Sequence, residues 1–359
     1  MTKVRWLGAL VAAGALVVAG AGSAGADDGS GDPVRGVPRT VALDTSPASV
    51  AVSPDGRKAY VSVKDSTHGA KLKVVDTQSG AITATVTLTT GFGADAGPVA
   101  VSPDGSRVYV LFGPSRKIPL SLLGTVDTAT NTLVSTTEAP DQPRPDGTNP
   151  GGLAALTVSP DGTRVFVTQN GPAAFHRPPQ EGTRVLEFSA RRQAYTAAVQ
   201  VPGHYAGSVV VRPDGDDAYA GTDEGLTHLD TSEQTPVVAG TVPVPVGPFV
   251  GLALSPDDTR LYGVGGGKGY AVDLATDTVT ATMDIAPGQR LSCLSTSADG
   301  TRLYMLVQDS SVLALDTATN TPVPGEGVTG LTYVTSMAVG PDGHTFYVTA
   351  NASLQIIGF

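Results

Sequence analysis

The stretch Pro98-Val99-Ala100-Val101-Ser102-Pro103-Asp104-Gly105 runs from an apolar strand pattern into a turn, and Arg107-Val108-Tyr109-Val110-Leu111 continues as a second strand with an aromatic residue. Pro presets φ, Asp tolerates the bridge region and Gly accepts positive φ, so Ser-Pro-Asp-Gly predicts a tight turn. The turn recurs, intact or with one substitution, seven times, at 53–56, 102–105, 159–162, 212–215, 255–258, 297–300 and 340–343. Successive copies begin 42 to 57 residues apart, a period typical of propellers and solenoids.

Each repeat contains four short strand patterns. In the second repeat they cover 98–101, 107–111, 124–127 and 132–136, with Gly, Pro, Asp and Asn between them and β-branched residues within them. Four antiparallel strands in a unit of this length describe a propeller blade. The sequence therefore predicts an all-β, seven-bladed β-propeller over residues 39–359.

The two ends of the chain predict how the ring closes. The seventh repeat stops after its third strand pattern, Leu354–Phe359, and no fourth pattern follows. A lone strand pattern, Val37–Leu43, stands before the first repeat. We expect this N-terminal strand to complete the last blade.

The N-terminus has the features of a signal peptide. Lys3 and Arg5 precede the apolar stretch 7–18, and Ala24-Gly25-Ala26 offers a small-residue cleavage site. We interpret 1–26 as a signal peptide, with an uncleaved membrane anchor as the alternative, and 27–38 as a flexible tether. These features predict a secreted, extracellular protein with no stable membrane insertion after cleavage.

Charge and cysteine content restrict the partners. The net charge is −10, and no cluster of Lys and Arg is visible, so a nucleic-acid partner is not expected. The single cysteine, Cys293, lies in an apolar strand pattern and is interpreted as a buried, inert thiol. A closed ring needs no second chain to cover its strand edges, which favours a monomer.

The repeats resemble those of the YVTN family of propellers, whose units carry a Ser-Pro-Asp-Gly turn, then Tyr-Val-Thr-Asn, then a Val-Ile-Asp-Thr-like strand. The nearest forms of the tetrapeptide are Phe166–Asn170 and Tyr347–Asn351, and the later unit is represented by Val74–Thr77 and Ala314–Thr317. The tetrapeptide is nowhere intact. The resemblance spans about residues 39–359 and implies the propeller fold, while the family is functionally mixed.

Loop length predicts the working face. One rim of such a ring carries tight turns, whereas the other carries second-to-third strand loops and blade links, including the long excursions 113–121, 138–152 and 170–182. Long loops on a rigid scaffold are common carriers of binding and catalysis. The alternative is that these loops are surface insertions without a function. The ligand-binding residues predicted on this face are Asp95, Asn170, His176, His204, Tyr205, Asp223, Arg290 and Tyr333.

Two functions remain open. The leading hypothesis is a binding scaffold for a protein, peptide or cell-envelope ligand. The alternative is a lactonase-like or lyase-like enzyme that acts on a small cyclic substrate at the channel mouth, although the His-Pro-Asn/Asp-Gly turn usual in such lactonases is absent. No cofactor is predicted. Histidine and carboxylate side chains on one rim leave a divalent metal as a minor alternative, without any regular ligand spacing.

Overall fold

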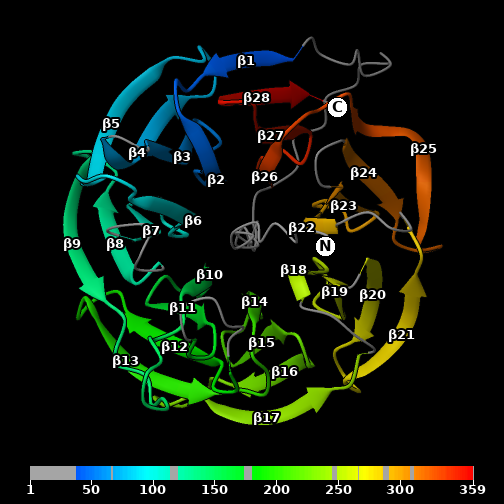
Figure 1. The fold of residues 1–359 in the computed structure, drawn as a ribbon. Helices are drawn as coiled ribbons and strands as arrows, with labels where there is room; N and C mark the ends of the chain where they lie inside the picture. Colours follow the sequence, from blue (N-terminus) through cyan, green and yellow to red (C-terminus); the bar gives the residue numbers. More distant parts are fainter. Residues whose placement is uncertain are drawn as a thin grey trace, which may run out of the picture.

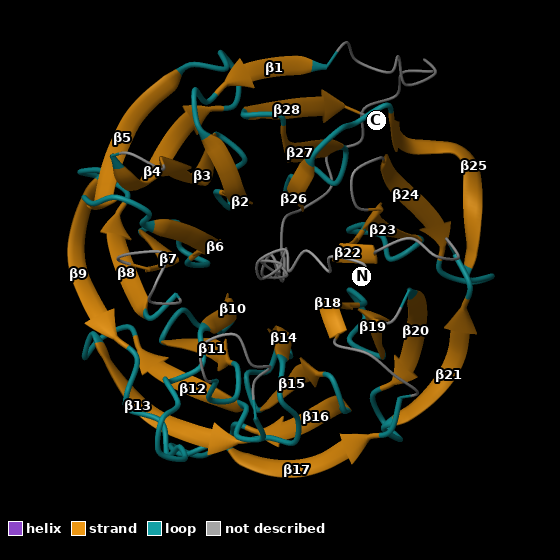
Figure 2. Ribbon diagram, in the orientation of Figure 1, coloured by secondary structure: helices purple, strands orange, loops and turns teal. Residues whose placement is uncertain are grey.

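The computed structural model describes residues 38–65, 68–113, 120–173, 180–244, 249–265, 267–285, 291–307 and 311–358. These residues form seven four-stranded antiparallel sheets arranged in a ring (Figure 1). The described segments are strands and connections, without a helix (Figure 2), and so include no helix long and apolar enough to cross a membrane. The predicted seven-bladed β-propeller is confirmed. The predicted signal peptide, 1–26, and the tether up to residue 37 lie outside the described residues.

Six blades follow the order of the chain. Their strands are β2(Ser46–Val52), β3(Lys58–Asp65), β4(Gly69–Asp76), β5(Ile82–Thr89); β6(Asp95–Val101), β7(Arg107–Gly113), β8(Leu122–Asp127), β9(Thr132–Glu138); β10(Leu153–Val158), β11(Arg164–Gln169), β12(Arg184–Ser189), β13(Ala194–Gln200); β14(Ala206–Val211), β15(Asp217–Thr222), β16(Gly225–Asp230), β17(Val237–Val242); β18(Phe249–Leu254), β19(Arg260–Gly265), β20(Lys268–Asp273), β21(Thr278–Met283); and β22(Leu291–Thr296), β23(Arg302–Val307), β24(Ser311–Asp316), β25(Thr321–Thr329). The first strand of each blade lies nearest the channel and the fourth lies at the periphery (Figure 1).

The seventh blade joins the two ends of the chain. It contains β26(Val334–Val339), β27(Thr345–Ala350) and β28(Ser353–Gly358), and β1(Arg39–Ala42) supplies its outer strand. Val41 pairs with Leu354, and the N–H of Leu43 donates to the carbonyl of Ala352 at 2.8 Å. The prediction that the N-terminal strand completes the last blade is therefore confirmed.

The repeated turn works as a closed hydrogen-bond unit. In the second blade the Ser102 hydroxyl donates to Asp104 Oδ1 at 2.5 Å and accepts the N–H of Arg107 at 2.9 Å. Asp104 also accepts the N–H of Ser106. The hydrogen bond from Ser102, followed by that from Ser106, holds the pKa of Asp104 below its ordinary value. The Asp of the motif thus has a structural partner set, as expected for turn chemistry.

The Asp-Thr pair at the end of the third strand has two tasks. Asp127 accepts the N–H of Thr130 at 2.9 Å and so organises the next turn. The Thr128 hydroxyl donates to the Gly105 carbonyl at 2.7 Å, which ties this turn to the Ser-Pro-Asp-Gly turn of its blade. A cation of the preceding blade, Lys58, donates to the Thr128 carbonyl. The same bond between blades recurs from Arg164 to Thr231 and from Arg260 to Thr317.

A β-bulge interrupts every innermost strand near its start. The register between first and second strands shifts in all seven blades. In the sixth blade the shift lies between Ser292 and Leu294, and Cys293 between them has φ 45° and is 2% exposed. The expected burial of this thiol is confirmed. A bulge turns backbone groups out of the ladder, which makes them accessible to the neighbouring blade.

In the first and third blades, a buried hydroxyl of the second strand forms a hydrogen bond with a backbone carbonyl at the bulge of the next blade. The Ser62 hydroxyl donates to the Gly97 carbonyl of the next blade at 2.7 Å. Thr168 donates to the Gly207 carbonyl at 2.8 Å and accepts the N–H of Ala155 at 3.0 Å. Ser62 and Thr168 stand two residues after the aromatic Tyr60 and Phe166, which are both buried. The aromatic residue therefore fills the core, while the hydroxyl joins adjacent blades.

A second connection between blades surrounds His228 on β16. Its Nδ1 lies 2.8 Å from Asp277 Oδ2 and its Nε2 lies 2.8 Å from Asp217 Oδ1. The ring stacks on Tyr219, whose hydroxyl donates to Asp277 Oδ1 at 2.8 Å. Asp277 belongs to the turn between β20 and β21, so the network joins the fourth and fifth blades. Burial lowers the pKa of His228, but the hydrogen bonds and charges of Asp217 and Asp277 outweigh it, and the pKa is raised.

We predict that Thr168→Val destabilises the protein by about 1–3 kcal/mol, because it keeps the shape of the side chain and leaves the Ala155 N–H and the Gly207 carbonyl without this partner. Chemical denaturation of wild type and variant measures the difference. Thr168→Ser retains the hydroxyl and is the control, which we expect to lie closer to wild type. Equal stability of the valine and serine variants would contradict the role assigned to the hydroxyl.

The contribution of His228 to stability should depend on pH. A raised folded-state pKa means that the stabilisation is fully present below the unfolded value, about 6.5, and is lost as pH rises through the folded value. We therefore expect the stability difference between wild type and His228→Gln to be larger at pH 6 than at pH 8.5. Denaturant midpoints at both pH values measure it. A difference that does not change with pH would show that His228 carries no extra proton in the folded state.

Candidate functional site

The long loops gather on one rim of the propeller, as the arrangement of the strands requires. This long-loop rim comprises the second-to-third strand loops and the links between blades, and the opposite turn rim carries the Ser-Pro-Asp-Gly turns. The described segments of the long-loop rim considered below are 90–94, 139–152, 170–173, 180–183, 201–205, 223–224 and 330–333. The segments over the third and fourth blades are joined to one another by hydrogen bonds.

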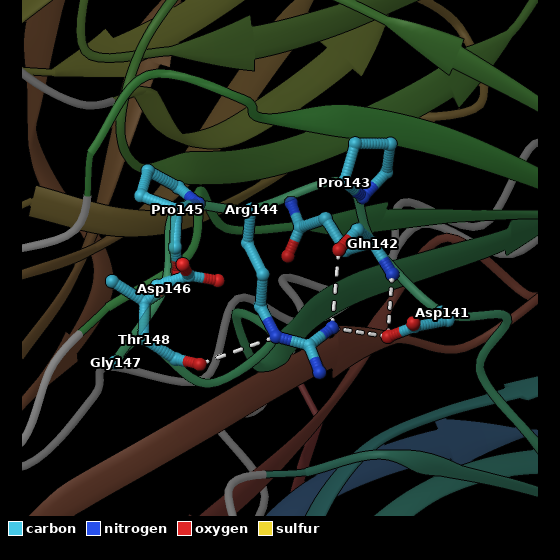
Figure 3. A pocket seen from close by; sticks show the side chains of 8 residues that line it. All are labelled: Asp141, Gln142, Pro143, Arg144, Pro145, Asp146, Gly147 and Thr148. Atoms are coloured by element: carbon cyan, nitrogen blue, oxygen red, sulfur yellow. Dashed lines mark hydrogen bonds and ion pairs between the residues drawn. The ribbon is translucent and has the colours of Figure 1, made fainter.

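The link 139–152 borders an open surface hollow of about 530 Å³ lined by residues 141–148 (Figure 3). Arg144 holds its ends together: the guanidinium donates to the Asp141 carboxylate, to the Gln142 carbonyl at 3.1 Å and to the Thr148 carbonyl at 3.2 Å. The hydrogen bond from Arg144 also holds the pKa of Asp141 below its ordinary value. The hollow is therefore a polar feature with a defined shape.

Two buried polar side chains attach this link to the third blade. Gln142, 2% exposed, donates to the carbonyls of Asn170 and Gly182 at 3.0 and 2.7 Å, and accepts the N–H of Gly151 at 2.8 Å. Arg184 donates to Gln169 Oε1 at 2.6 Å and to the carbonyls of residues 140 and 141. Buried polar groups with satisfied partners rigidify a structure, so these hydrogen bonds hold the long link against the third blade.

Glycine is required where these loops approach one another. A Cβ on Gly171 would lie 1.7 Å from the Gln180 carbonyl oxygen, and one on Gly151 would lie 2.0 Å from the Asn170 carbonyl oxygen. The N–H of Gly171 donates to the His204 carbonyl at 2.9 Å, which joins the loop of the third blade to the link that follows it.

His204 stands among three carboxylates on this structure. Its Nδ1 lies 3.3 Å from Asp223 Oδ2 and 3.9 Å from Glu224 Oε1. One ligand atom each from Glu181, His204 and Glu224 lie within 4.8 Å of one another. Glu181 and Glu224 are exposed and His204 is half-buried, so the group opens to solvent.

Asp223 fixes the position of His204 through the backbone. Its Oδ1 accepts the N–H groups of His204 and Tyr205 at 2.8 and 3.0 Å, and Asn170 Oδ1 accepts the next N–H, that of Ala206, at 2.8 Å. Four of the predicted site residues are thus brought together: Asn170, His204, Tyr205 and Asp223. Asp223 acts here by holding the backbone of the link 201–205, and Asn170 by holding the backbone of Ala206, the first residue of β14.

Two further predicted site residues lie apart from this group. Asp95 begins β6 and forms an ion pair with Lys64 at 3.4 Å. Tyr333 lies in the link to the seventh blade with φ 51° and a 75% exposed side chain. His176 and Arg290 lie outside the described residues.

Sequence reasoning missed Glu181, Gln142 and Arg184. Gln142 and Glu181 belong to segments chosen for their length, and nothing in the local pattern distinguishes them from surface residues. Arg184 is the first residue of β12, Arg184–Ser189, directly before the apolar pair Val185-Leu186, and a cation next to an apolar strand pattern is the one signal that was available.

We predict that Gln142→Ala frees the link 139–152 from the third blade, because three hydrogen bonds of a buried side chain are lost. Amide hydrogen exchange should accelerate in 139–152 and 170–173, and global stability should decrease by about 1–3 kcal/mol. Thr148→Val, which removes a half-buried hydroxyl that donates to the Pro145 carbonyl within the same link, is the control and should leave exchange in 170–173 unchanged. Unchanged exchange in Gln142→Ala would contradict the anchoring role.

The comparisons with known proteins support the fold alone. No family model matches the sequence, and no curated protein matches it. Among solved structures, Kuenenia stuttgartiensis hydrazine synthase is similar with a TM-score of 0.69 and 16% identity over 89% of this chain and 97% of that chain. A chain of the mitotic checkpoint complex is similar with a TM-score of 0.71 and 16% identity over 96% of this chain and 98% of that chain. Both similarities agree with a seven-bladed β-propeller.

Proposed function

We propose that this chain is a secreted, YVTN-like propeller that binds a protein, peptide or cell-envelope ligand on its long-loop rim. The observation that carries the proposal is the anchoring of the long link 139–152 by Gln142 and Arg184. A loop held in one conformation loses little entropy when a partner binds. The N-terminal pattern at 1–26 supports export, and the repeated Ser-Pro-Asp-Gly turns support the family resemblance.

Two exposed aromatic side chains on the same rim favour a macromolecular partner. Phe92, in the link between the first and second blades, is 76% exposed, and Tyr333, in the link between the sixth and seventh, is 75% exposed. Large aromatic residues are enriched at interfaces and often provide much of the binding energy. The polar hollow at 141–148 and the carboxylates near His204 would then form the polar part of such a contact.

A lactonase-like or lyase-like activity at the channel mouth is the second candidate. The arrangement of His204 beside Asp223 and Glu224 favours it, because an imidazole held by a carboxylate can transfer a proton. Turnover of a lactone by the wild type that is lost in His204→Ala would move this candidate to first place.

We predict that Phe92→Ser/Tyr333→Ser weakens association with the binding partner at least tenfold, because two exposed aromatic contacts are removed. The measurement is co-sedimentation of the purified protein with the envelope fraction of the producing cell, followed by titration. Val237→Ser/Val238→Ser is the matched control, since these exposed apolar side chains lie on β17 at the periphery of the fourth blade. Equal binding by both double variants, or no binding by the wild type, would overturn the proposed role of the rim.

A further inference from the structure

Glu181, His204 and Glu224 come from three loops and meet at one point on the long-loop rim. Glu181 lies before β12 in the third blade, His204 lies in the link to the fourth blade, and Glu224 lies in the hairpin between β15 and β16. Their ligand atoms are all within 4.8 Å of one another. Donors in a tetrahedral site, at about 2.0–2.2 Å from Zn²⁺, are separated by about 3.3–3.6 Å. The three side chains would therefore rotate toward one another to bind one ion.

The backbone that carries these side chains is held in place on each side. Gly182, next to Glu181, has its carbonyl bound by Gln142, while the His204 carbonyl accepts the N–H of Gly171. The N–H of Glu224 donates to the Thr222 hydroxyl at 3.2 Å. The backbone of all three loops would thus already be positioned by hydrogen bonds before a cation binds.

Asp223 lies against the imidazole of His204. Its Oδ1 is held by two backbone N–H groups, and its Oδ2 lies 3.3 Å from His204 Nδ1. Metal-bound histidines commonly have a carboxylate partner that fixes the orientation of the ring. With Asp223 on Nδ1, Nε2 is the nitrogen that would bind the cation, and Glu224, whose Oε1 lies 3.9 Å from Nδ1, would turn toward Nε2.

The charges of the group favour a cation. Asp223, Glu224 and Glu181 place three carboxylates around one imidazole, and the ion pairs of Asp223 and Glu224 within the described residues both lead to His204. A divalent ion would offset two of these negative charges and accept lone pairs from the carboxylate oxygens. A nitrogen donor beside carboxylates suits zinc and related first-row ions better than calcium, which takes oxygen ligands.

We propose that Glu181, His204 and Glu224 bind one first-row divalent cation of the zinc class, with Asp223 orienting the imidazole. Three protein ligands leave at least one coordination position open toward solvent, the arrangement found in zinc sites that bind or activate an exchangeable ligand. The site goes beyond the binding function proposed above and does not depend on it, since it would hold the cation in the absence of any partner.

The test is titration of the chelator-treated, purified protein with Zn²⁺, using calorimetry and thermal unfolding. We expect one Zn²⁺ per chain and an upward shift of Tm. His204→Ala should abolish the high-affinity phase, and Glu181→Gln and Glu224→Gln should each weaken it at least tenfold. The controls are His68→Ala, a histidine of the first blade on the same rim that pairs with Asp65, and Glu233→Gln, an exposed carboxylate on the turn rim. Both should bind as the wild type does.

Three results would overturn the proposal: no saturable binding of Zn²⁺ by the wild type, equal binding by wild type and Glu181→Gln/Glu224→Gln, or binding of Ca²⁺ in preference to Zn²⁺. The first result would identify the group as an ion pair between His204 and its carboxylates. Unfolding curves without metal show whether each variant is folded. If His204→Ala does not fold, the double glutamine variant, which retains the side-chain shapes, decides the outcome.

Discussion

The pairing of β1 with β28 is the contact on which the rest of the ring depends. Each blade packs its inner strands on those of its neighbours, so an open ring would leave two blade faces and a strand edge uncovered. Here the strand that covers the edge of β28 comes from the other end of the chain, and buried Val41 and Leu43 attach it to the core. Separation of the ends therefore requires loss of hydrogen bonds and apolar burial at the same time.

Polar contacts of two kinds recur at several other junctions between blades. The hydroxyls of Ser62 and Thr168 bind carbonyls at the bulge of the next innermost strand, and the cations Lys58, Arg164 and Arg260 bind the Asp-Thr turn of the next blade. Such contacts are directional, so they determine the angle between blades where apolar packing alone would permit sliding. The network at His228 is a local addition between the fourth and fifth blades.

The two rims differ in how completely their polar groups are used within the fold. On the turn rim, Ser, Asp and Thr side chains bind the backbone of their own turns, as Ser102 and Asp104 do. On the long-loop rim, Gln142, Arg184 and Asp223 anchor the loops, and the hollow at 141–148, the aromatic residues Phe92 and Tyr333 and the group around His204 face outward. This rim therefore presents polar, charged and aromatic side chains to solvent, and the proposed binding and metal functions both lie there for that reason.

The sequence by itself determined the number of blades, the chemistry of the turns and the closure of the ring, because these depend on strand periodicity and on residues close together in the chain. It also predicted that Asn170, His204, Tyr205 and Asp223 share the long-loop rim. Only the tertiary structure decided that Asp223 holds His204, that Glu181 joins them, and that Gln142 and Arg184 anchor the link 139–152. These contacts join residues up to 44 positions apart, and their geometry follows from the packing of folded loops on two neighbouring blades, which no local pattern encodes.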